Sequence, residues 1–471
     1  MPVARLPEAM ATHRFPATRV FYRKLTRDFP LIVRGEGCWL YDEDGRAYLD
    51  GCGGAFVANI GHGVAEVADA MAEQARRLAY VNGTAFTHGA VEELADEVAA
   101  LCPPGLRHVY PLSSGSDAVE AALKLARQFW VESGRPGKHV VVALAPAYHG
   151  NTLLALSASA REHYRAHYRD WLVDVERVPA PGGYRCPCRG APPLCDACSG
   201  AALEAAILRR GPERVAAFIA EPVGGSSTGA VVPPPGYFAR VREICDRHEV
   251  LFVADEVLVG AGRTGSWSAL EPTGVTPDVM VLGKGIAGGY APLSAVVATA
   301  RVVDAIAGGS GAFLHAQTFS HHPVLCAAGV ATIRYLAAHQ LVERCARMGE
   351  RLHRRLAALR ELPWVGDVRG RGLLAAVELV ADRATRRPFP RAEGMAERVT
   401  AGALEAGLVV WPNVGHADGE QGDLVLLAPP FTVSEDELDE MVARLCRALE
   451  VGGAVGAPAA STAGLARGAI A

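Results

Sequence analysis

Strand-length apolar runs that alternate with helical stretches are the feature that most constrains the fold of this 471-residue chain. Four such runs carry no polar alternation: Val140–Leu144, Ala217–Ala220, Leu251–Ala254 and Val279–Leu282. Strands with this pattern are buried on both faces. Between the runs, segments such as Ala118–Val131 and Phe238–His248 have apolar residues near helical spacing. Buried strands that alternate with helices predict an α/β fold with a mostly parallel sheet.

The two ends of the chain differ from this middle part. Short strand candidates separated by a turn lie near the N-terminus, and long helices rich in Ala, Leu and Arg begin near residue 331. We therefore expect a large domain over residues 66–330 and a small α+β domain built from residues 1–65 and 331–451. Residues 452–471 are rich in Gly and Ala and unpatterned, which predicts a flexible tail.

Composition bears mainly on location and partners. The 47 basic and 51 acidic residues give a net charge of −4 without a basic stripe, which argues against nucleic acid as a partner. No apolar run has the length of a membrane span. The segment Met1–Leu25 lacks the apolar region and cleavage site of a signal peptide. We therefore expect a cytoplasmic protein that binds neither membrane nor nucleic acid, in which most of the eleven cysteines are small buried residues.

Two polar residues directly follow predicted buried strands. Asp255 follows Leu251–Ala254, and Lys284, which lies between two glycines, follows Val279–Leu282. Ligands of open parallel sheets bind beyond the carboxyl ends of the strands. There the carboxylate could keep a cationic ring nitrogen protonated, and a desolvated lysine would be a nucleophile for an aldehyde. Taken singly, Asp255 could also cap a helix, and Lys284 could be a solvated loop residue.

Two further segments supply groups that suit a phosphorylated ring. The Ser-x-x-Asp pattern from Ser114 to Asp117 predicts a capping box, and the N-terminus of a helix suits a phosphate, although many helices begin this way. Tyr148, in Ala-Tyr-His-Gly after another strand, could stack on a planar ring or simply be a packed loop aromatic. Together with Asp255 and Lys284, these are the parts of a pyridoxal-phosphate site.

With these motifs the sequence resembles the class III aminotransferases of the fold type I pyridoxal-phosphate superfamily, roughly from Leu31 to Leu449. The resemblance lies in LFVADEVLVGAGRTGSW, PDVMVLGKGIAGGYAPLSA, SSGSDAVEAALKLAR, AYHG, AEPVGG and QTFSHHP. It implies that Lys284 holds pyridoxal 5′-phosphate as an aldimine and that Asp255 pairs with the ring nitrogen.

The same resemblance implies roles for residues around this pair. Ser114, Gly115 and Ser116 would bind the phosphate, Tyr148 would stack on the ring and Val257 would pack on its opposite face. His149 and Glu221 would lie near the cofactor. Thr318 would reach the phosphate of the neighbouring subunit, so that the expected form is a homodimer with shared active sites.

The implied activity is the transfer of an amino group from a primary (ω-)amine to a keto acid, aldehyde or ketone by a ping-pong mechanism. Racemases, aminomutases, decarboxylases and phospho-lyases share the lysine chemistry of this class and form the alternative. A non-catalytic regulatory protein is a further possibility, but the presence of Lys284 and Asp255 argues against it.

The chain departs from the family at two positions of the substrate pocket. Leu426 stands where members acting on ornithine or 4-aminobutyrate have a carboxylate-binding arginine, and Ser226 replaces the glutamate that gates it. Phe56 matches an aromatic residue of amine transaminase pockets. We therefore expect Phe56 and Leu426 to line the pocket, and donors without a distal carboxylate to be preferred, because an unpaired buried charge is costly. No arginine lies between Arg398 and Arg444, and the sequence names no residue for the acceptor carboxylate.

The segment CPCRGAPPLCDAC contains two close pairs of cysteines, Cys186 with Cys188 and Cys195 with Cys198. Two such pairs can bind zinc tetrahedrally, although the spacing of the first pair is shorter than usual. The alternative is an insertion loop with incidental thiols. A zinc ion here would be structural and would lie away from the cofactor.

Overall fold

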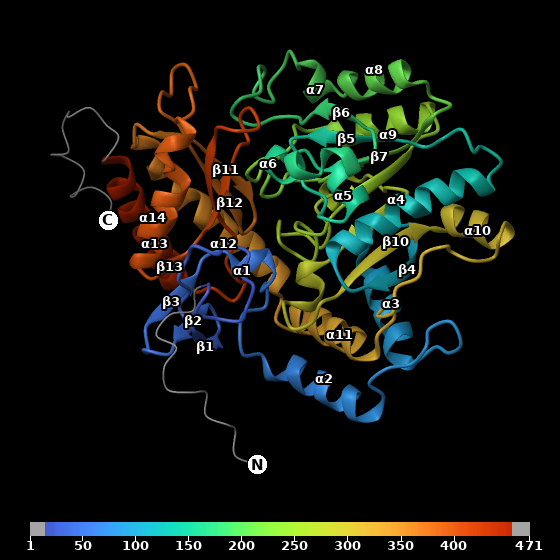
Figure 1. Cartoon of the computed structure of the whole chain (residues 1–471), viewed down its shortest axis with the longest axis horizontal. Coiled ribbons are helices and arrows are strands. Elements are labelled where there is room, and N and C mark those ends of the chain that lie inside the picture. Colours follow the sequence, from blue (N-terminus) through green and yellow to red (C-terminus); the bar gives the residue numbers. More distant parts are fainter. Residues whose placement is uncertain (1–14, 455–471) are drawn as a thin grey trace.

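The computed structural model describes residues 15–454, and a seven-stranded sheet lies at its centre (Figure 1). In sheet order the strands are β4 (Leu106–Leu112), β10 (Ser294–Thr299), β9 (Val279–Leu282), β8 (Leu251–Asp255), β7 (Val215–Ala220), β5 (Val140–Ala145) and β6 (Val175–Pro179). Strand β10 runs antiparallel to both neighbours, and the other pairs are parallel. This confirms the predicted α/β fold, and all four predicted apolar runs form strands of the sheet.

Helices cover both faces of this sheet, which explains why its central strands lack polar alternation. The helices are α4 (Gly115–Glu132) and α10 (Ala300–Gly308) on one face, and α8 (Ala201–Arg210) and α9 (Tyr237–Arg247) on the other. In β8, Leu251 and Val253 face the first layer, whereas Phe252 and Ala254 face the second. Burying one large apolar side chain stabilises the fold by about 1.5–3 kcal/mol, so the sheet is a rigid platform for the groups at its strand ends.

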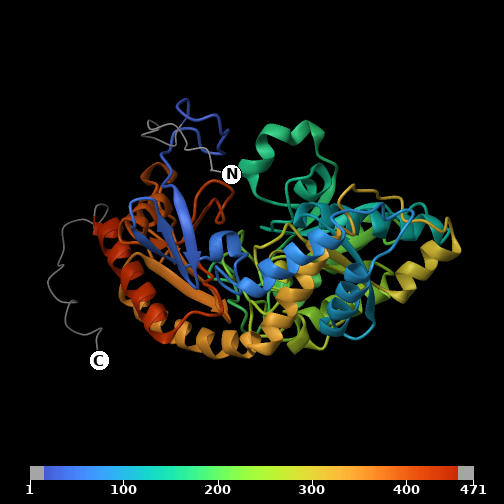
Figure 2. The ribbon, with the colours of Figure 1, turned by 90° about the horizontal axis from the view of Figure 1, so that it is seen from below.

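Two smaller sheets lie beside the central one, and the first of them joins the two ends of the chain. One has the order β1 (Ile32–Glu36), β2 (Trp39–Asp42), β3 (Ala47–Asp50) and β13 (Leu408–Val409), and the other β11 (Val365–Arg371), β12 (Leu374–Leu379), β15 (Asp423–Leu427) and β14 (Trp411–Val414). Strand β13 pairs in parallel with β3. Figure 2 shows the N-terminal strands in blue beside the C-terminal helices in red. The exact domain boundaries stay a prediction.

The remaining helices pack around these sheets. They are α1 (Gly53–Phe56), α2 (Ala65–Arg77), α3 (Gly89–Leu101), α5 (Leu153–Ala158), α6 (Glu162–Arg165), α7 (Asp196–Ser199), α11 (Pro323–Ala338), α12 (Leu341–Leu356), α13 (Met395–Glu405) and α14 (Glu435–Ala454). Short 3-10 turns include η3 (Lys284–Ala287). Within residues 15–454 no single helix combines the length and apolar composition of a membrane span; only α11 and Leu341–Glu361 together, bent by 62°, meet those criteria.

Several strands carry no clear signal in the sequence. Strand β4 contains the run Leu-Arg-His-Val-Tyr-Pro-Leu, in which polar residues and a proline interrupt the apolar pattern. The strands β10, β11, β13 and β14 were likewise not predicted. Helix α14 continues to residue 454; the rest of the predicted tail, and the first fourteen residues of the predicted N-terminal part, lie outside the described residues.

Candidate active site

A cavity of about 310 Å³ lies at the carboxyl ends of the parallel strands. Asp255 ends β8, Lys284 follows β9 after one glycine, and Glu221 follows β7. Tyr148 and His149 lie in the loop after β5 and line the same cavity. Four separate strands thus bring these five side chains together, as expected for a ligand site of an open parallel sheet.

The carboxylate of Asp255 is held from two sides. Its Oδ2 lies 2.7 Å from Nδ1 of the buried His149, and its Oδ1 accepts a hydrogen bond of 3.1 Å from the Val257 amide. Burial is the largest effect on the His149 ring and opposes its charging, but the hydrogen bond with Asp255 and the charges of Asp255 and Glu221 together outweigh it and raise the pKa of His149. The Nε2 atom of His149 has no hydrogen-bond partner among the described residues. A polar atom buried in this way is a group that a bound molecule can satisfy.

Lys284 is half-buried at the start of η3 and has a positive φ of 44°. Burial lowers the pKa of its ammonium group, and the charges of Asp255 and Glu221 offset part of this effect. The backbone around it is tightly packed, because a Cβ on Gly285 would lie 2.8 Å from Nδ2 of Asn59. The amide of Asn59 also donates to the Gly285 carbonyl at 3.0 Å. The lysine is therefore held on a fixed turn at the cavity wall, and its amine is easier to deprotonate than a solvated one.

The N-terminus of helix α4 forms another wall of the cavity. Ser114 caps the helix, since its Oγ accepts a hydrogen bond of 3.2 Å from the Asp117 amide, which confirms the predicted cap. Gly115 and Ser116 line the cavity beside it. A Cβ on Gly115 would lie only 2.8 Å from Cγ1 of Val257, so glycine is needed for this close approach. Free amides at the start of an 18-residue helix are suited to a phosphate.

Glu221 fixes the loops around the cavity. Its Oε2 accepts hydrogen bonds from the Tyr148 amide at 3.2 Å and from the Ser227 hydroxyl at 3.3 Å, and its Oε1 accepts one from the Gly225 amide at 2.9 Å. Burial raises the pKa of this carboxyl group. Tyr148 lines the cavity with its ring, and Asn151 donates a hydrogen bond of 2.8 Å to its hydroxyl.

Of the two residues predicted for the substrate pocket, only one lines the cavity. Phe56 does so, with its ring centroid 5.2 Å from that of Trp411. Leu426 is fully buried in an apolar cluster with Leu374 and Ala376, which corrects the prediction that it faces the substrate. Its neighbour across the sheet, Trp411 on β14, reaches the cavity instead.

Thr318, predicted for the partner subunit's site, does not line the cavity. It is exposed, and its carbonyl accepts a hydrogen bond of 3.0 Å from the Tyr80 hydroxyl. The four predicted zinc ligands come together in the loop between β6 and α8, and none of them lines the cavity.

The cavity contains an arginine that the sequence did not point to. Arg161 precedes α6, and its guanidinium lies 5.7 Å from the ring centroid of Tyr148 and 4.9 Å from that of Tyr164. It donates to Ser226 Oγ at 3.4 Å and to Asn413 Oδ1. Among the described residues no carboxylate pairs with it, and its Nε has no partner. Burial lowers the pKa of Arg161. Arg161 lies far in sequence from the segment between Arg398 and Arg444, where the sequence offers no arginine for the acceptor carboxylate.

A second arginine stands at the outer side of the same pocket. Arg23 lines the cavity and donates a hydrogen bond of 2.5 Å to the Tyr164 hydroxyl. The residues present fit a phosphorylated pyridine aldehyde: a helix N-terminus for the phosphate, a carboxylate for the ring nitrogen, and a partly desolvated lysine for the aldehyde. The same pocket offers a buried cation for a further anionic group.

Comparisons with known proteins agree with this geometry. The chain is 36% identical over 420 residues to the uncharacterized aminotransferase YodT of Bacillus subtilis, covering 89% of this chain and 94% of that protein. The crystal structure of a transaminase from the marine bacterium Virgibacillus matches with a TM-score of 0.85 and 32% identity, over 92% of this chain and 95% of that one. The ω-transaminase of Pseudomonas jessenii in complex with PMP matches with a TM-score of 0.84 and 31% identity, over 91% and 94%.

The sequence model of one family covers nearly the whole described chain. It is that of the class-III aminotransferases, which are pyridoxal-phosphate enzymes, and it matches residues 22–449. The matched region includes every residue assigned above to the cavity. The chain therefore belongs to the class-III aminotransferase family and is an aminotransferase.

Proposed function

We propose that this enzyme uses pyridoxal phosphate to transfer an amino group from a primary amine to a keto acid in a ping-pong reaction. The observation that carries the proposal is the position of Lys284, a half-buried amine of lowered pKa, in one cavity with the Asp255–His149 pair. When bound, the cofactor supplies an aldehyde and a ring that accepts electrons.

Lys284 has two tasks in this scheme. Its neutral amine binds the aldehyde covalently between turnovers, which a charged ammonium group cannot do. After the substrate amine takes its place, the freed Nζ acts as general base and moves a proton away from the substrate carbon. Burial favours the neutral amine in both tasks, since it lowers the pKa of Lys284.

Asp255 holds a proton on the ring nitrogen. Its two oxygens accept hydrogen bonds from His149 Nδ1 and from the Val257 amide, which fixes both oxygens at the cavity wall. The raised pKa of His149 keeps this imidazole able to donate to the carboxylate. The helix α4 amides and Ser116 would hold the cofactor's phosphate, and Tyr148 and Val257, which line the same cavity, would contact its ring.

Arg161 binds the carboxylate of the acceptor. A buried guanidinium without a carboxylate partner is costly, and a ligand carboxylate offsets that cost. Its planar fork suits a carboxylate held by two parallel hydrogen bonds. The sequence named no residue that binds the acceptor carboxylate, and we assign this role to Arg161. Acceptors such as pyruvate and 2-oxoglutarate carry a carboxylate that the guanidinium can bind.

The donor is a primary amine that packs its body against Phe56 and Trp411. We expected donors without a distal carboxylate to be preferred because the pocket was thought to contain no cation. Arg161 lies in the cavity, so this argument holds only in part. A donor carboxylate would compete for the same guanidinium. We therefore propose that the donor's distal group is apolar or hydroxylated and that Arg161 serves the acceptor.

A half-reaction assay tests this function. Added amine should convert the cofactor absorbance to that of the pyridoxamine form in proportion to the amine, and a keto acid should restore it. A racemase would leave the absorbance of the resting enzyme in place after turnover. If no amine in a broad panel converts the cofactor, the proposal is wrong.

We also propose a homodimer in which Thr318 of each chain contributes to the other site. Lys284→Ala and Thr318→Glu chains, each inactive alone, should regain activity when refolded together. In the mixed dimer one site has an intact lysine from one chain and an intact threonine from the other. Two inactive parents whose mixture stays inactive, although it forms mixed dimers, would contradict shared sites.

A further inference from the structure

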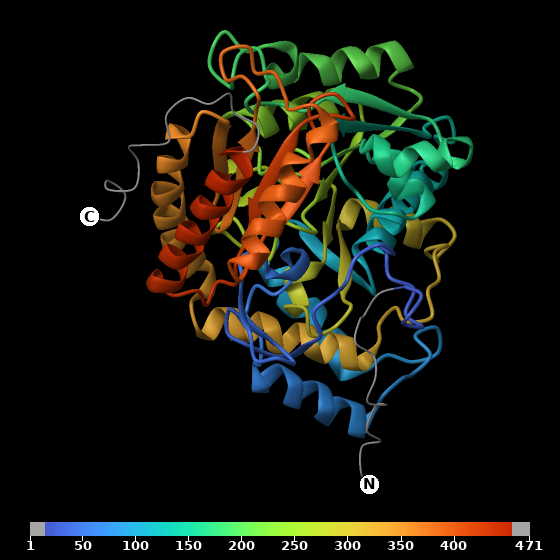
Figure 3. The same cartoon turned by 60° about the vertical axis from the view of Figure 1, so that its left-hand side comes forward.

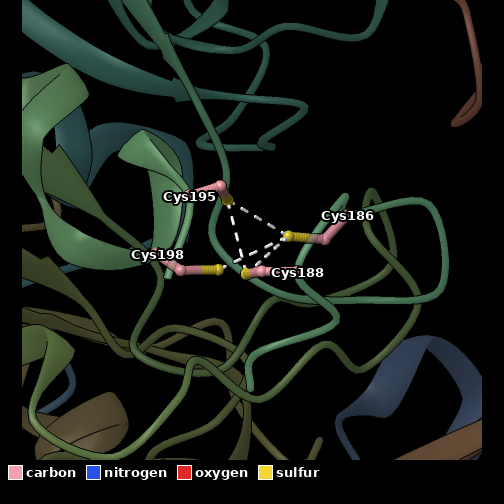
Figure 4. Close-up of side chains that lie close together, drawn as sticks. All are labelled: Cys186, Cys188, Cys195 and Cys198. Atoms are coloured by element: carbon pink, nitrogen blue, oxygen red, sulfur yellow. Dashed lines mark hydrogen bonds between the residues drawn. The ribbon is translucent and has the colours of Figure 1, made fainter. Parts of the chain in front are cut away.

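The loop between β6 and α8 gathers four thiols into one cluster (Figure 4). Cys186 Sγ lies 3.6 Å from Cys188, 3.5 Å from Cys195 and 3.4 Å from Cys198, and the Cys188 and Cys195 sulfurs are 3.5 Å apart. All four sulfurs lie within 4.8 Å of one another. The cluster is thus a compact tetrahedron of sulfur atoms, contributed by a 13-residue segment.

These distances match a metal site better than they match disulfides. A zinc–sulfur bond is about 2.3 Å, so two sulfurs of a tetrahedral site are about 3.8 Å apart. A disulfide would bring two sulfurs to about 2.05 Å and would leave the other two unrelated. Here Cys186 has the other three sulfurs at 3.4–3.6 Å, and all four sulfurs lie within 4.8 Å of one another, as four ligands around one ion do.

The backbone of the loop is built to aim the thiols inward. After the first pair the chain reverses through Arg189, with φ of 51°, and Gly190, with φ of 77°. The Cys188 carbonyl accepts a hydrogen bond from the Ala191 amide at 2.9 Å. Cys195 begins the short helix α7, which turns Cys198 towards the cluster, and Gly182 donates its amide to Cys198 Sγ at 3.2 Å. The short spacing of Cys186 and Cys188 therefore does not prevent metal binding, because the chain reversal brings both sulfurs into the cluster.

We propose that Cys186, Cys188, Cys195 and Cys198 bind one structural zinc ion. Four thiolate ligands close the coordination sphere, so the ion has no open position for a substrate or water and plays no part in the chemistry of the cavity. Soft sulfur ligands in a tetrahedron select zinc over the hard cations magnesium and calcium. Binding releases the thiol protons, and the site therefore forms more tightly as the pH rises.

The loop that contains the four cysteines, residues 186–198 with the two residues before it, also joins the large sheet to the C-terminal part of the chain. Figure 3 shows it at the top of the molecule, in green, beside loops of the C-terminal part in orange. Tyr184 donates its hydroxyl to the Arg383 carbonyl at 3.0 Å, and Arg185, next to the first cysteine, lies 2.9 Å from the buried carboxylate of Glu378 on β12. The ion would thus fix the residues that hold the two parts together.

The same contacts lead back towards the cavity. Glu378 also pairs with Arg369 at 2.7 Å, and Arg369 donates to the Thr228 carbonyl at 2.8 Å. Thr228 lies two residues after Ser226, the residue that accepts a hydrogen bond from Arg161. Loss of zinc should therefore loosen the loop that positions Arg161, and the effect should fall on the KM of the acceptor and on thermal stability rather than on the reaction at Lys284.

Metal analysis of enzyme purified without a metal-affinity step tests the proposal directly. We expect about one zinc per chain, and an extended X-ray absorption fine structure that fits four sulfurs at about 2.3 Å. Cys188→Ser/Cys195→Ser should lose the zinc, whereas the matched control Cys102→Ser/Cys446→Ser, at two other partly exposed cysteines, should keep it. The wild-type measurements need no variant, so they decide the matter even if the double variant fails to fold.

Three results would overturn the proposal. The first is an enzyme that contains no zinc and takes up none when zinc is added to the reduced protein. The second is a thiol count of seven in the denatured, unreduced chain, which would show that the cluster forms two disulfides. The third is iron in place of zinc, with the visible absorbance of a sulfur-bound iron ion.

Discussion

The inner and outer ends of the cavity are built in different ways. At the inner end, Asp255, Lys284 and Glu221 lie at the carboxyl ends of buried parallel strands, and the sheet fixes their positions. At the outer end, Arg161 lies in a loop and Trp411 comes from a separate sheet of the C-terminal part. In the proposed reaction the inner end serves chemistry that every substrate shares, whereas the outer end meets the part of the substrate that varies.

This difference also separates what a sequence reveals from what it hides. A residue after a buried strand has its place set by the strand itself. A residue such as Arg161 reaches the cavity only because segments distant in sequence pack around it: Asn413 is 252 residues away and Ser226 65 residues away. Substitutions at both ends test whether the division holds.

The largest effect is expected at the inner end, from Lys284→Ala. Without the amine, turnover should be abolished for every donor and acceptor, because both covalent binding of the aldehyde and the proton shift need it. Steady-state assays and the absorbance of the resting enzyme measure the two losses separately. Turnover like that of the wild type would remove Lys284 from the mechanism.

Asp255→Asn should retain the cofactor but slow the proton shift by several orders of magnitude. A neutral amide does not hold the ring nitrogen protonated, and the hydrogen bond with His149 is weakened at the same time. Single-turnover rates with a saturating amine give the size of the loss. A fall of less than about tenfold, or 1.4 kcal/mol, would mean that Asp255 is not the partner of the ring.

The substitution Leu426→Arg tests whether Leu426 faces the substrate, as the sequence predicted, or is buried, as the structure shows. If Leu426 faced the substrate, the new arginine would improve donors that carry a carboxylate. Because Leu426 is fully buried among apolar side chains, we expect instead a loss of stability of about 3–5 kcal/mol. Thermal unfolding measures it, and Leu426→Met, which keeps the volume, should cost less than about 1.5 kcal/mol.

Arg161→Met should weaken the enzyme selectively. Loss of hydrogen bonds to a carboxylate costs about 1.5–3 kcal/mol, or about 10- to 150-fold in kcat/KM for a keto acid. An aldehyde acceptor has no carboxylate, so its kcat/KM should change far less. Arg165→Met, at an arginine that pairs with Glu162 outside the cavity, is the matched control. Equal losses for both acceptors would assign Arg161 a purely structural role.

The smallest effect concerns the pH dependence of stability at the inner end. The pKa of His149 is raised above its usual value, so its contribution is fully present below about pH 6.5, the ordinary histidine value, and is lost as the pH rises through the raised pKa. The difference in Tm between the wild type and His149→Gln, both without cofactor, should therefore shrink as the pH rises. A difference that grows with pH would mean that the ring is neutral in the folded state.

The sequence predicts the central sheet well because its evidence is local. Runs such as Val279–Leu282 have no polar residue, and burial on both faces is the physical reason. The runs also show where the strands end, and therefore place Asp255 and Lys284 at the carboxyl ends of the strands. The edge strand β4, with Arg107 and His108 exposed, and the two-residue strand β13 lack such a pattern and form only through their neighbours.

The substrate end could not be predicted in the same way. Leu426 was assigned to the pocket because it stands where related enzymes have a carboxylate-binding arginine, but which side chains of a strand face a cavity depends on the elements that pack around that strand. Trp411, directly opposite Leu426 on β14, occupies that place. The four cysteines, in contrast, could be recognised as a group because they lie close together in sequence. That their sulfurs lie within 4.8 Å of one another is seen only in the structure.

The pairing of β3 with β13 has a consequence for synthesis of the chain. Leu49 meets Leu408, so the strand near the start must wait for a partner made about 360 residues later. At about 5–20 residues per second, this takes roughly 20–70 seconds on the ribosome. During that time the edge of β3 is open to other chains, and strand edges of this kind promote aggregation. Yield in the cell should therefore depend on chaperones that bind the nascent chain more than on the stability of the finished enzyme.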